Sequence, residues 1–164
     1  MGVTVTIDKM ALLEAMMKAM DTASVLVGIP SASEKNVRDD TPETNAEIGF
    51  VNEFGEPSMN IPPRPFLVPG VMNSMDKNTR VMMRGAQQAM SLSGNPESQI
   101  QQTLDTVGLI AQQAVQAQII DGEYTPLAPY TLAQRRSRGF VGEKPLIETG
   151  SLKNSITYVV EKNA

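Results

Sequence analysis

The chain has 164 residues, a formal net charge of −4 and only 4% aromatic residues. It contains no histidine and no cysteine, which excludes the commonest general base and metal ligand, thiol nucleophiles and disulfide bonds. The negative charge argues against a general nucleic-acid binder, because phosphate contacts need clustered Lys and Arg. We therefore expect a single domain over residues 1–164 that is not an enzyme and that carries no cofactor or metal.

The N-terminal region predicts a strand, a helix and a second strand. Residues 3–7 alternate between valine or isoleucine and threonine, the period of two expected of a strand. Asp8 is the expected N-cap of a helix with one apolar stripe. The stripe consists of Leu12, Leu13, Met16, Met17 and Met20. Residues 24–29 then predict a strand that returns to the same sheet. No signal peptide and no run of ~20 apolar residues is recognisable, so we expect a soluble protein.

Residues 31–44 are polar almost throughout and predict a mobile loop. The loop is either a solvated insertion or a finger that becomes ordered against a partner. Residues 45–54 are more apolar, and their spacing fits either a short helix or an irregular strand before Gly55.

A proline-rich arm follows. Its prolines fix φ and remove backbone donors, so residues 60–67 are expected to form an edge strand or an extended segment. The arm presents Arg64 and Phe66 at a low cost in conformational entropy, and arginine and aromatic residues are enriched at protein interfaces. Two roles stay open. Arg64 would dock onto a neighbouring protein, and Phe66 with Leu67 would pin the following helix to the sheet.

Two long amphipathic helices are predicted next. The first covers residues 68–92, and we expect its apolar stripe to be buried. The stripe consists of Val71, Met72, Met75, Thr79, Met82, Met83, Ala86 and Met90. The second helix begins after the N-cap Asn95 and ends near Ile120. Its polar face is rich in glutamine, which either is buried against another subunit or reflects the high helix propensity of glutamine.

The C-terminal region contains a proline-stiffened connector over residues 125–130, a short helix over 131–136 and a strand over 155–161. The predicted fold is α+β. A small mixed or antiparallel sheet has strands near 3–7, 24–29, 60–67 and 155–161. The N-terminal helix and the two long helices pack against this sheet.

Three short motifs occur in order along the chain. The sequence reads VNEFG, then IPPRPFL, then PLIETGSLKNSITY, with the two amphipathic helices between the second and the third. This arrangement resembles the tail-completion or neck proteins of tailed bacteriophages, which are also described as head–tail joining, virion morphogenesis or minor tail proteins. The resemblance spans about residues 24–160. A tryptophan common in that family is absent, and Tyr124 stands near its place. The matching positions are Glu53, Phe54 and Gly55; Pro63, Arg64, Pro65, Phe66, Leu67 and Pro69; and Pro145, Leu146, Thr149, Gly150, Leu152, Ser155 and Ile156.

The resemblance implies a structural virion protein, made in the bacterial host cytoplasm, that forms a ring at the head–tail junction. The ring would be a hexamer or a dodecamer. Its partners would be other copies, the head–tail connector and the tail terminator or tube proteins, with no membrane. The expected interface residues are Glu53, Phe54, Arg64, Phe66, Thr149 and Leu152. Genomic DNA would pass through the lumen without sequence-specific binding, and an acidic loop facing the lumen would not retain it. That loop would contribute Asp39, Asp40 and Glu43.

Two other classes of function stay open. Residues 62–65, Pro-Pro-Arg-Pro, satisfy the P-x-x-P pattern of a peptide-recognition or scaffolding adaptor. The densest basic patch would serve a weak nucleic-acid-binding protein. This patch consists of Arg135, Arg136, Arg138 and Lys144. An enzyme is disfavoured, because the chain lacks a G-x-S-x-G motif, metal-ligand spacing and a phosphate-binding loop.

Overall fold

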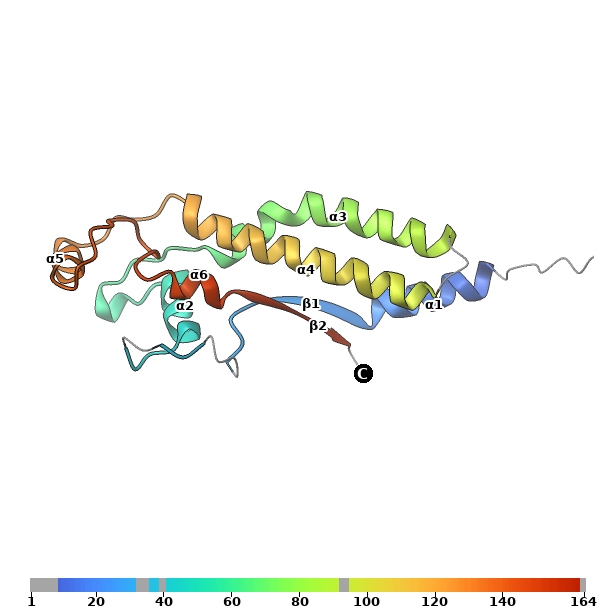
Figure 1. Ribbon diagram of the computed structural model, residues 1–164, viewed down its shortest axis with the longest axis horizontal. Helices are drawn as coiled ribbons and strands as arrows, with labels where there is room; N and C mark the ends of the chain where they lie inside the picture. The colour runs from blue at the N-terminus through green and yellow to red at the C-terminus, as the bar shows by residue number, and fades with distance from the viewer. Residues whose placement is uncertain (1–8, 32–35, 39–40, 92–94, 163–164) are drawn as a thin grey trace, which may run out of the picture.

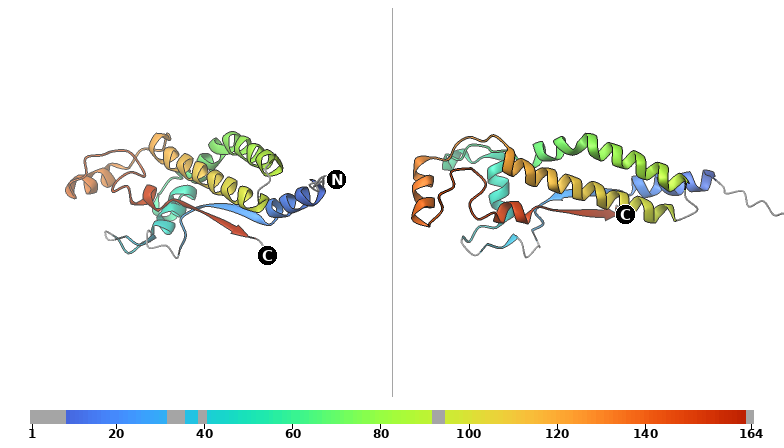
Figure 2. Two further views of the ribbon diagram at one scale, coloured as in Figure 1. Left: turned by 45° about the vertical axis from the view of Figure 1, so that its right-hand side comes forward. Right: turned by 45° about the horizontal axis from the view of Figure 1, so that its top comes forward.

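The computed structural model describes residues 9–31, 36–38, 41–91 and 95–162. The central helix α4 is flanked by α3 on one side and by a two-stranded sheet on the other (Figure 1). The molecule is elongated, with α5 at one end and α1 at the other in both views of Figure 2. In chain order the elements are α1 (Lys9–Asp21), β1 (Ala23–Gly28), α2 (Asn45–Phe54), the 3-10 turn η2 (Pro57–Met59), α3 (Leu67–Ser91), α4 (Pro96–Asp121), α5 (Pro129–Ser137), α6 (Ser151–Ser155) and β2 (Thr157–Lys162).

The fold is a mostly helical α+β arrangement whose sheet consists of β1 and β2, paired antiparallel. The strands expected near 24–29 and 155–161 are confirmed to within two residues. The strand expected over 60–67 is wrong, because Ile61 makes only an isolated bridge to Glu56 before α3 begins at Leu67. Prolines in this segment lack the N–H groups that a ladder needs. The strand expected over 3–7 and the N-cap Asp8 lie outside the described residues.

The two long helices are confirmed, but the face of α3 that packs on α4 is not the predicted methionine stripe. The buried residues of α3 are Gly70, Ser74, Gly85 and Ala89, all of them small. A Cβ atom at Gly70 would lie 2.6 Å from the Cα atom of Val115, so the two backbones approach closely. The expected burial of the stripe is therefore wrong for Met72, Met75, Met83 and Met90, which are between 46% and 62% exposed.

Two hydrophobic clusters hold the layers together, one near each end of α4. The first lies under the start of α3 and contains Phe66, Val115, Ile119, Leu152 and Ile156. The second joins α1 to the far end of the α3–α4 pair and contains Met16, Ala89, Ile100 and Leu104. Met17 of the predicted α1 stripe is instead 60% exposed. No helix in the described part of the chain has the length and hydropathy needed to cross a membrane.

The helical alternative for residues 45–54 is confirmed by α2. Thr44 is its N-cap and forms a capping box with Glu47, whose carboxylate accepts a hydrogen bond from the Thr44 N–H at 2.8 Å. The Thr44 hydroxyl donates to the same carboxylate at 2.9 Å. The backbone and side-chain hydrogen bonds from Thr44 together lower the pKa of Glu47. In the described part of the polar loop, Asn36 is buried and its Oδ1 accepts a hydrogen bond from the Ala46 N–H at 2.8 Å. Asn36 therefore ties this part of the loop to α2.

Candidate functional site

The carboxylate of Glu53 connects α2 to the beginning of α3. It accepts hydrogen bonds from three backbone N–H groups, those of Phe66 at 2.7 Å, Leu67 at 2.8 Å and Val68 at 3.1 Å. N–H groups at the start of a helix have no acceptor within the helix, and a negative charge there also meets the positive end of the helix dipole. Glu53 is only 7% exposed and caps a helix that begins 14 residues later.

Arg64 connects the proline arm to the connector that follows α4. Its backbone N–H donates to the Asn52 carbonyl at 2.6 Å. Its guanidinium donates to the carbonyls of Thr125 at 2.9 Å and Pro126 at 3.2 Å. Burial, with a further contribution from the charge of Arg135, lowers the pKa of Arg64. The side chain expected to reach a neighbouring protein is thus occupied within its own chain.

The third motif packs against the second motif and against α2, the helix that carries most of the first motif. Phe66 and Leu152 belong to one hydrophobic cluster, and Gly49 of α2 lies against both of them. Asn45 of α2 also donates from Nδ2 to Ser151 Oγ of α6 at 3.0 Å. The three motifs therefore meet in one unit, formed by α2, residues 61–66 and α6, which we call the motif junction. Leu67 and Val27 of β1 pack against the same cluster, so the expectation that Phe66 and Leu67 pin the start of α3 to the sheet of their own chain is confirmed.

Tyr124 offers a test of packing at this end of α4. Its hydroxyl donates to the Gln118 carbonyl at 2.6 Å. Burial, with a smaller contribution from the charge of Glu53, raises the pKa of Tyr124 to about 12. The folded state therefore keeps a proton that an unfolded tyrosine loses near pH ~10. The contribution of Tyr124 to the free energy of unfolding is therefore complete below pH ~10. It is lost as the pH rises toward the pKa of Tyr124 in the folded state.

We expect Tyr124→Phe to remove one phenolate absorbance step near pH ~12 and to lower the free energy of unfolding at neutral pH by about 1 kcal/mol, the worth of one hydrogen bond. Between pH ~10 and ~12 the difference from the unsubstituted chain should shrink. Spectrophotometric titration and urea unfolding at several pH values measure both effects. Loss of the absorbance step near pH ~10, where an exposed tyrosine titrates, would contradict the burial of this hydroxyl.

The predicted interface residues divide into two groups. Glu53, Arg64, Phe66 and Leu152 are buried inside the motif junction and hold it together. Phe54 and Thr149 are exposed, so they alone of the six present side chains to a partner in this conformation. Of the loop expected to face the lumen, Asp39 and Asp40 lie outside the described residues. Glu43 is exposed beside Glu47 at a groove of about 980 Å³, which leaves its position in an assembly a prediction.

The sequence analysis named Phe54 as an interface residue but missed Phe50, with which Phe54 forms an exposed aromatic pair on α2. Phe50 and Phe54 are each 65% exposed, and their ring centroids lie 4.9 Å apart. They line an apolar groove of about 220 Å³ with Ile29, Leu67 and Val68, among others. We call Phe50 and Phe54 the aromatic ridge. Their spacing of four residues places them on one helical face, and that spacing was the available signal.

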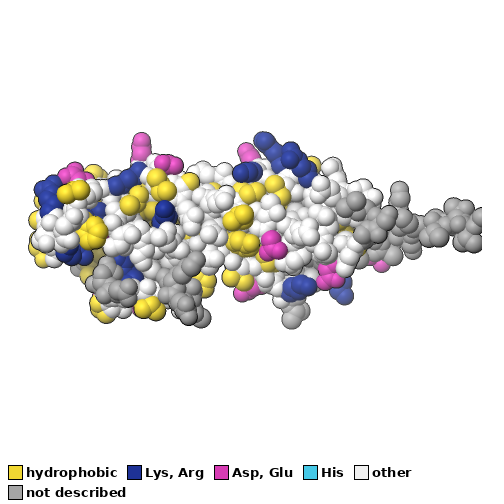
Figure 3. Space-filling view, in the orientation of Figure 1, with side chains coloured by type: hydrophobic (Ala, Val, Ile, Leu, Met, Phe, Trp, Pro, Cys, Tyr) yellow, Lys and Arg dark blue, Asp and Glu magenta, His cyan; other side chains and the backbone are white. Residues whose placement is uncertain are grey.

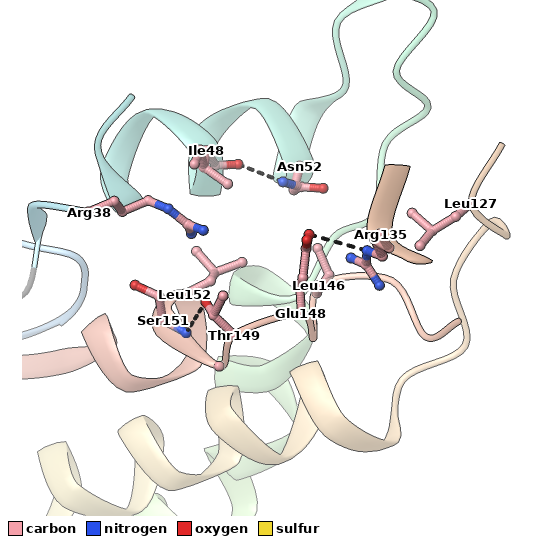
Figure 4. A pocket seen from close by; sticks show the side chains of 11 residues that line it. Arg38, Ile48, Asn52, Leu127, Arg135, Leu146, Glu148, Thr149, Ser151 and Leu152 are labelled. Carbon is pink, nitrogen blue, oxygen red and sulfur yellow. Dashed lines mark hydrogen bonds and ion pairs between the residues drawn. The ribbon is translucent and has the colours of Figure 1, made fainter. Parts of the chain in front are cut away.

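A polar pocket of about 180 Å³ lies between α2, α5 and α6 (Figure 4). Arg135 pairs with Glu148 at 3.2 Å and also donates to the Lys144 carbonyl at 2.8 Å. On the opposite wall, Arg38 donates to Asn45 Oδ1 at 3.1 Å. On each wall, a charged side chain therefore ties a loop to its neighbouring segment.

The predicted basic patch is engaged in the same network. Arg138 pairs with Glu148 at 2.8 Å and Arg136 with Glu143 at 2.7 Å. The Lys144 ammonium donates to the Ile120 carbonyl. With the contacts of Arg135, all four cations have acceptors inside the chain. Within the described residues, no group of three His, Cys, Asp or Glu side chains lies close enough together to hold a metal ion.

The motif junction and the aromatic ridge are the two features of this region that bear on function. The junction is buried and structural, whereas the ridge is exposed and apolar. Comparison with known proteins adds no further constraint, because no family model matches the chain and no curated protein or solved structure is significantly similar to it.

Proposed function

We propose that this chain is a structural virion protein of a tailed bacteriophage, a neck or tail-completion subunit. It assembles into a ring at the head–tail junction, joins the tail to the capsid connector and lets DNA pass. The observation that carries the proposal is the meeting of all three resembling motifs in one junction. Glu53 of the first motif binds backbone N–H groups of the second, and Leu152 of the third packs on Phe66. Because the three motifs contact one another, their joint occurrence supports a relationship to the neck proteins better than three unconnected matches would.

A ring subunit needs two different surfaces that meet head to tail. The aromatic ridge supplies one of them, because exposed aromatic side chains beside an apolar groove are typical anchors of protein interfaces. The motif junction holds α2 against α6 and the arm, so the ridge projects from a rigid support. In the proposed assembly it contacts either the next copy in the ring or the connector or tail protein above or below.

The peptide-recognition and nucleic-acid-binding alternatives both need arginine or lysine side chains that are free to contact a partner. A P-x-x-P ligand needs its arginine at the surface, whereas Arg64 is only 6% exposed and bonded to carbonyls of its own chain. A nucleic-acid interface over residues 135–144 needs free cations, whereas each of its four cations already has an acceptor inside the chain. No observation in the described structure favours either function over the virion protein.

We expect the variant Phe50→Ser with Phe54→Ser to fold normally but to fail in assembly. Both rings are largely exposed, so their loss removes little core packing. Loss of two anchor side chains at about 1.4 kcal/mol each weakens the contact about 100-fold, so the yield of joined particles should fall steeply. The measurement is complementation of a phage that lacks the gene. Joined particles, free heads and free tails are counted by electron microscopy, and circular dichroism verifies the fold.

The matched control is Val141→Ser, which removes an apolar side chain that is 87% exposed and far from α2 in the sequence. It should complement fully. A normal yield of joined particles from the folded ridge variant would remove the ridge from the proposal. Antibody labelling of intact particles tests the function itself, and a label away from the head–tail junction, or no label at all, would contradict it.

A further inference from the structure

Helix α3 has a second apolar face. It carries large side chains, whereas the face that packs on α4 carries small ones. Its large side chains are exposed, namely Val68 at 54%, Met72 at 62%, Met75 at 56%, Met83 at 60% and Met90 at 46%. Their spacing, completed by Thr79 and Ala86, keeps them on one side of the helix. We call these seven residues the methionine seam. The seam consists of Val68, Met72, Met75, Thr79, Met83, Ala86 and Met90.

The spacing of the seam is palindromic. The intervals from Val68 to Met90 are four, three, four, four, three and four residues, so they read the same from either end, with Thr79 at the centre. A second α3 running antiparallel across a two-fold axis at Thr79 would therefore place each seam residue opposite another one. Met75 would meet Met83 of the second copy. This is the self-complementarity that an isologous contact requires.

The charges beside the seam fit the same arrangement. Asp76 and Arg80 lie along one edge of the seam, both are exposed, and neither belongs to an ion pair within the described residues. Basic side chains gather over α3 in Figure 3. In the antiparallel pair, Asp76 of each copy lies within about one turn of Arg80 of the other. The two Arg80 side chains also lie near each other at the axis, and the two Asp76 carboxylates flank them, so each Asp76 forms an ion pair that offsets this repulsion.

A groove beside the centre of the seam provides space for the side chains of the second copy. It measures about 390 Å³ and lies between α1 and α3, where it is lined by Met20, Met75, Thr79, Met82 and Met83, among others. Because the groove lies at the expected two-fold axis, each copy offers a groove to the methionines of the other. Methionine adapts its shape readily, which suits such a contact.

From the palindromic spacing, the complementary charges and the central groove, we propose that α3 pairs antiparallel with α3 of a second copy across a two-fold axis at Thr79. The dimer covers a row of exposed methionines that would otherwise favour non-specific association. It uses α3, whereas the aromatic ridge lies on α2, and the two surfaces adjoin at Val68, which ends the seam and also lines the groove beside the ridge. The inference does not rest on the proposed virion function.

Cysteine cross-linking tests the geometry directly, because the chain has no cysteine of its own. Thr79→Cys places one thiol from each copy at the two-fold axis and should form a disulfide-linked dimer on mild oxidation. Val68→Cys or Met90→Cys alone should stay uncross-linked, because identical positions lie about 33 Å apart along the helix axis at ~1.5 Å per residue. An equimolar mixture of these two variants should cross-link.

Each other outcome has a definite meaning. Cross-linking of Val68→Cys with itself would show a parallel contact and overturn the proposal. Failure of both Thr79→Cys and the mixed pair to cross-link would also overturn it, as would a wild-type chain that sediments as a monomer at all concentrations.

Charge reversal gives an independent readout by sedimentation equilibrium. Asp76→Arg or Arg80→Asp alone should weaken dimerisation at least about tenfold, because like charges then face each other twice. Combining the two changes should restore it. The matched control is Lys77→Asp, on the same helix but away from the seam, and this variant should dimerise normally. Equal loss in the single and combined variants would contradict the predicted pairing.

Discussion

Replacing Glu53 with alanine is expected to lower the free energy of unfolding by about 3–5 kcal/mol. The carboxylate accepts three backbone hydrogen bonds at the beginning of α3 and is almost fully buried. A buried donor left without an acceptor costs about 1–3 kcal/mol, and the loss of the negative charge at the helix N-terminus adds to this. Water entering the space left by the side chain would restore part of the loss. Urea unfolding followed by circular dichroism measures the effect.

Two further variants separate the hydrogen bonds from the other contributions of Glu53. Glu53→Gln keeps the volume and one acceptor oxygen, so it should lose roughly half as much stability. Glu56→Ala removes an exposed carboxylate that caps the short turn η2 through Ser58 at 3.2 Å, and a much smaller loss of stability is expected there. If Glu53→Ala cost no more than Glu56→Ala, the capping role of Glu53 would be refuted. The motif junction would then need another explanation.

The second large effect is expected at Gly70, where α3 crosses α4. An added Cβ would lie 2.6 Å from the Cα atom of Val115, and a backbone atom cannot turn aside as a side chain does. Gly70→Ala therefore forces the helices apart and should lower the free energy of unfolding by about 2–3 kcal/mol. Helix propensity alone predicts the opposite sign, a gain of about 1 kcal/mol. Thermal unfolding should show a midpoint about 4–10 °C lower.

Gly142→Ala is the matched control for Gly70→Ala. Its Cβ meets no atom within 4 Å, so the same substitution should change stability by less than about 0.5 kcal/mol. Gly85→Ala is a second test of the same packing, because its Cβ would lie 2.8 Å from Thr103 Cβ, an atom that rotation of the side chain does not move. A stabilised Gly70→Ala variant would contradict the close packing of α3 on α4.

The amphipathic pattern of α3 shows where reasoning from sequence reached its limit. A hydrophobic stripe was visible, and it predicted both the helix and the existence of an apolar face. It did not predict that Gly70 and Gly85 would form the contact with α4, because small residues contribute little apolar area and close backbone approach depends on the shape of the partner. The exposed methionines are therefore available for a contact with another molecule.

The proline arm shows the same limit for individual side chains. Its stiffness was predicted, and so was the anchoring of α3 by Phe66, since a rigid apolar segment before a helix packs readily under it. The direction of Arg64 was not predictable. Whether its guanidinium reaches carbonyls at residues 125–126 or a neighbouring protein depends on how the connector folds back, about 60 residues further along the chain.

The sequence alone determined the features set by local backbone chemistry. Asn95 and Pro96 define the beginning of α4 and Gly122 its end, because caps, proline and glycine act on neighbouring hydrogen bonds. The exclusion of imidazole and thiol chemistry likewise follows from the sequence, because it contains no histidine and no cysteine. Only the tertiary structure decided that Glu53 caps α3 and that α3 packs through its small residues. Those outcomes depend on which groups from distant parts of the sequence come within hydrogen-bond or van der Waals distance. The local sequence does not determine these distances.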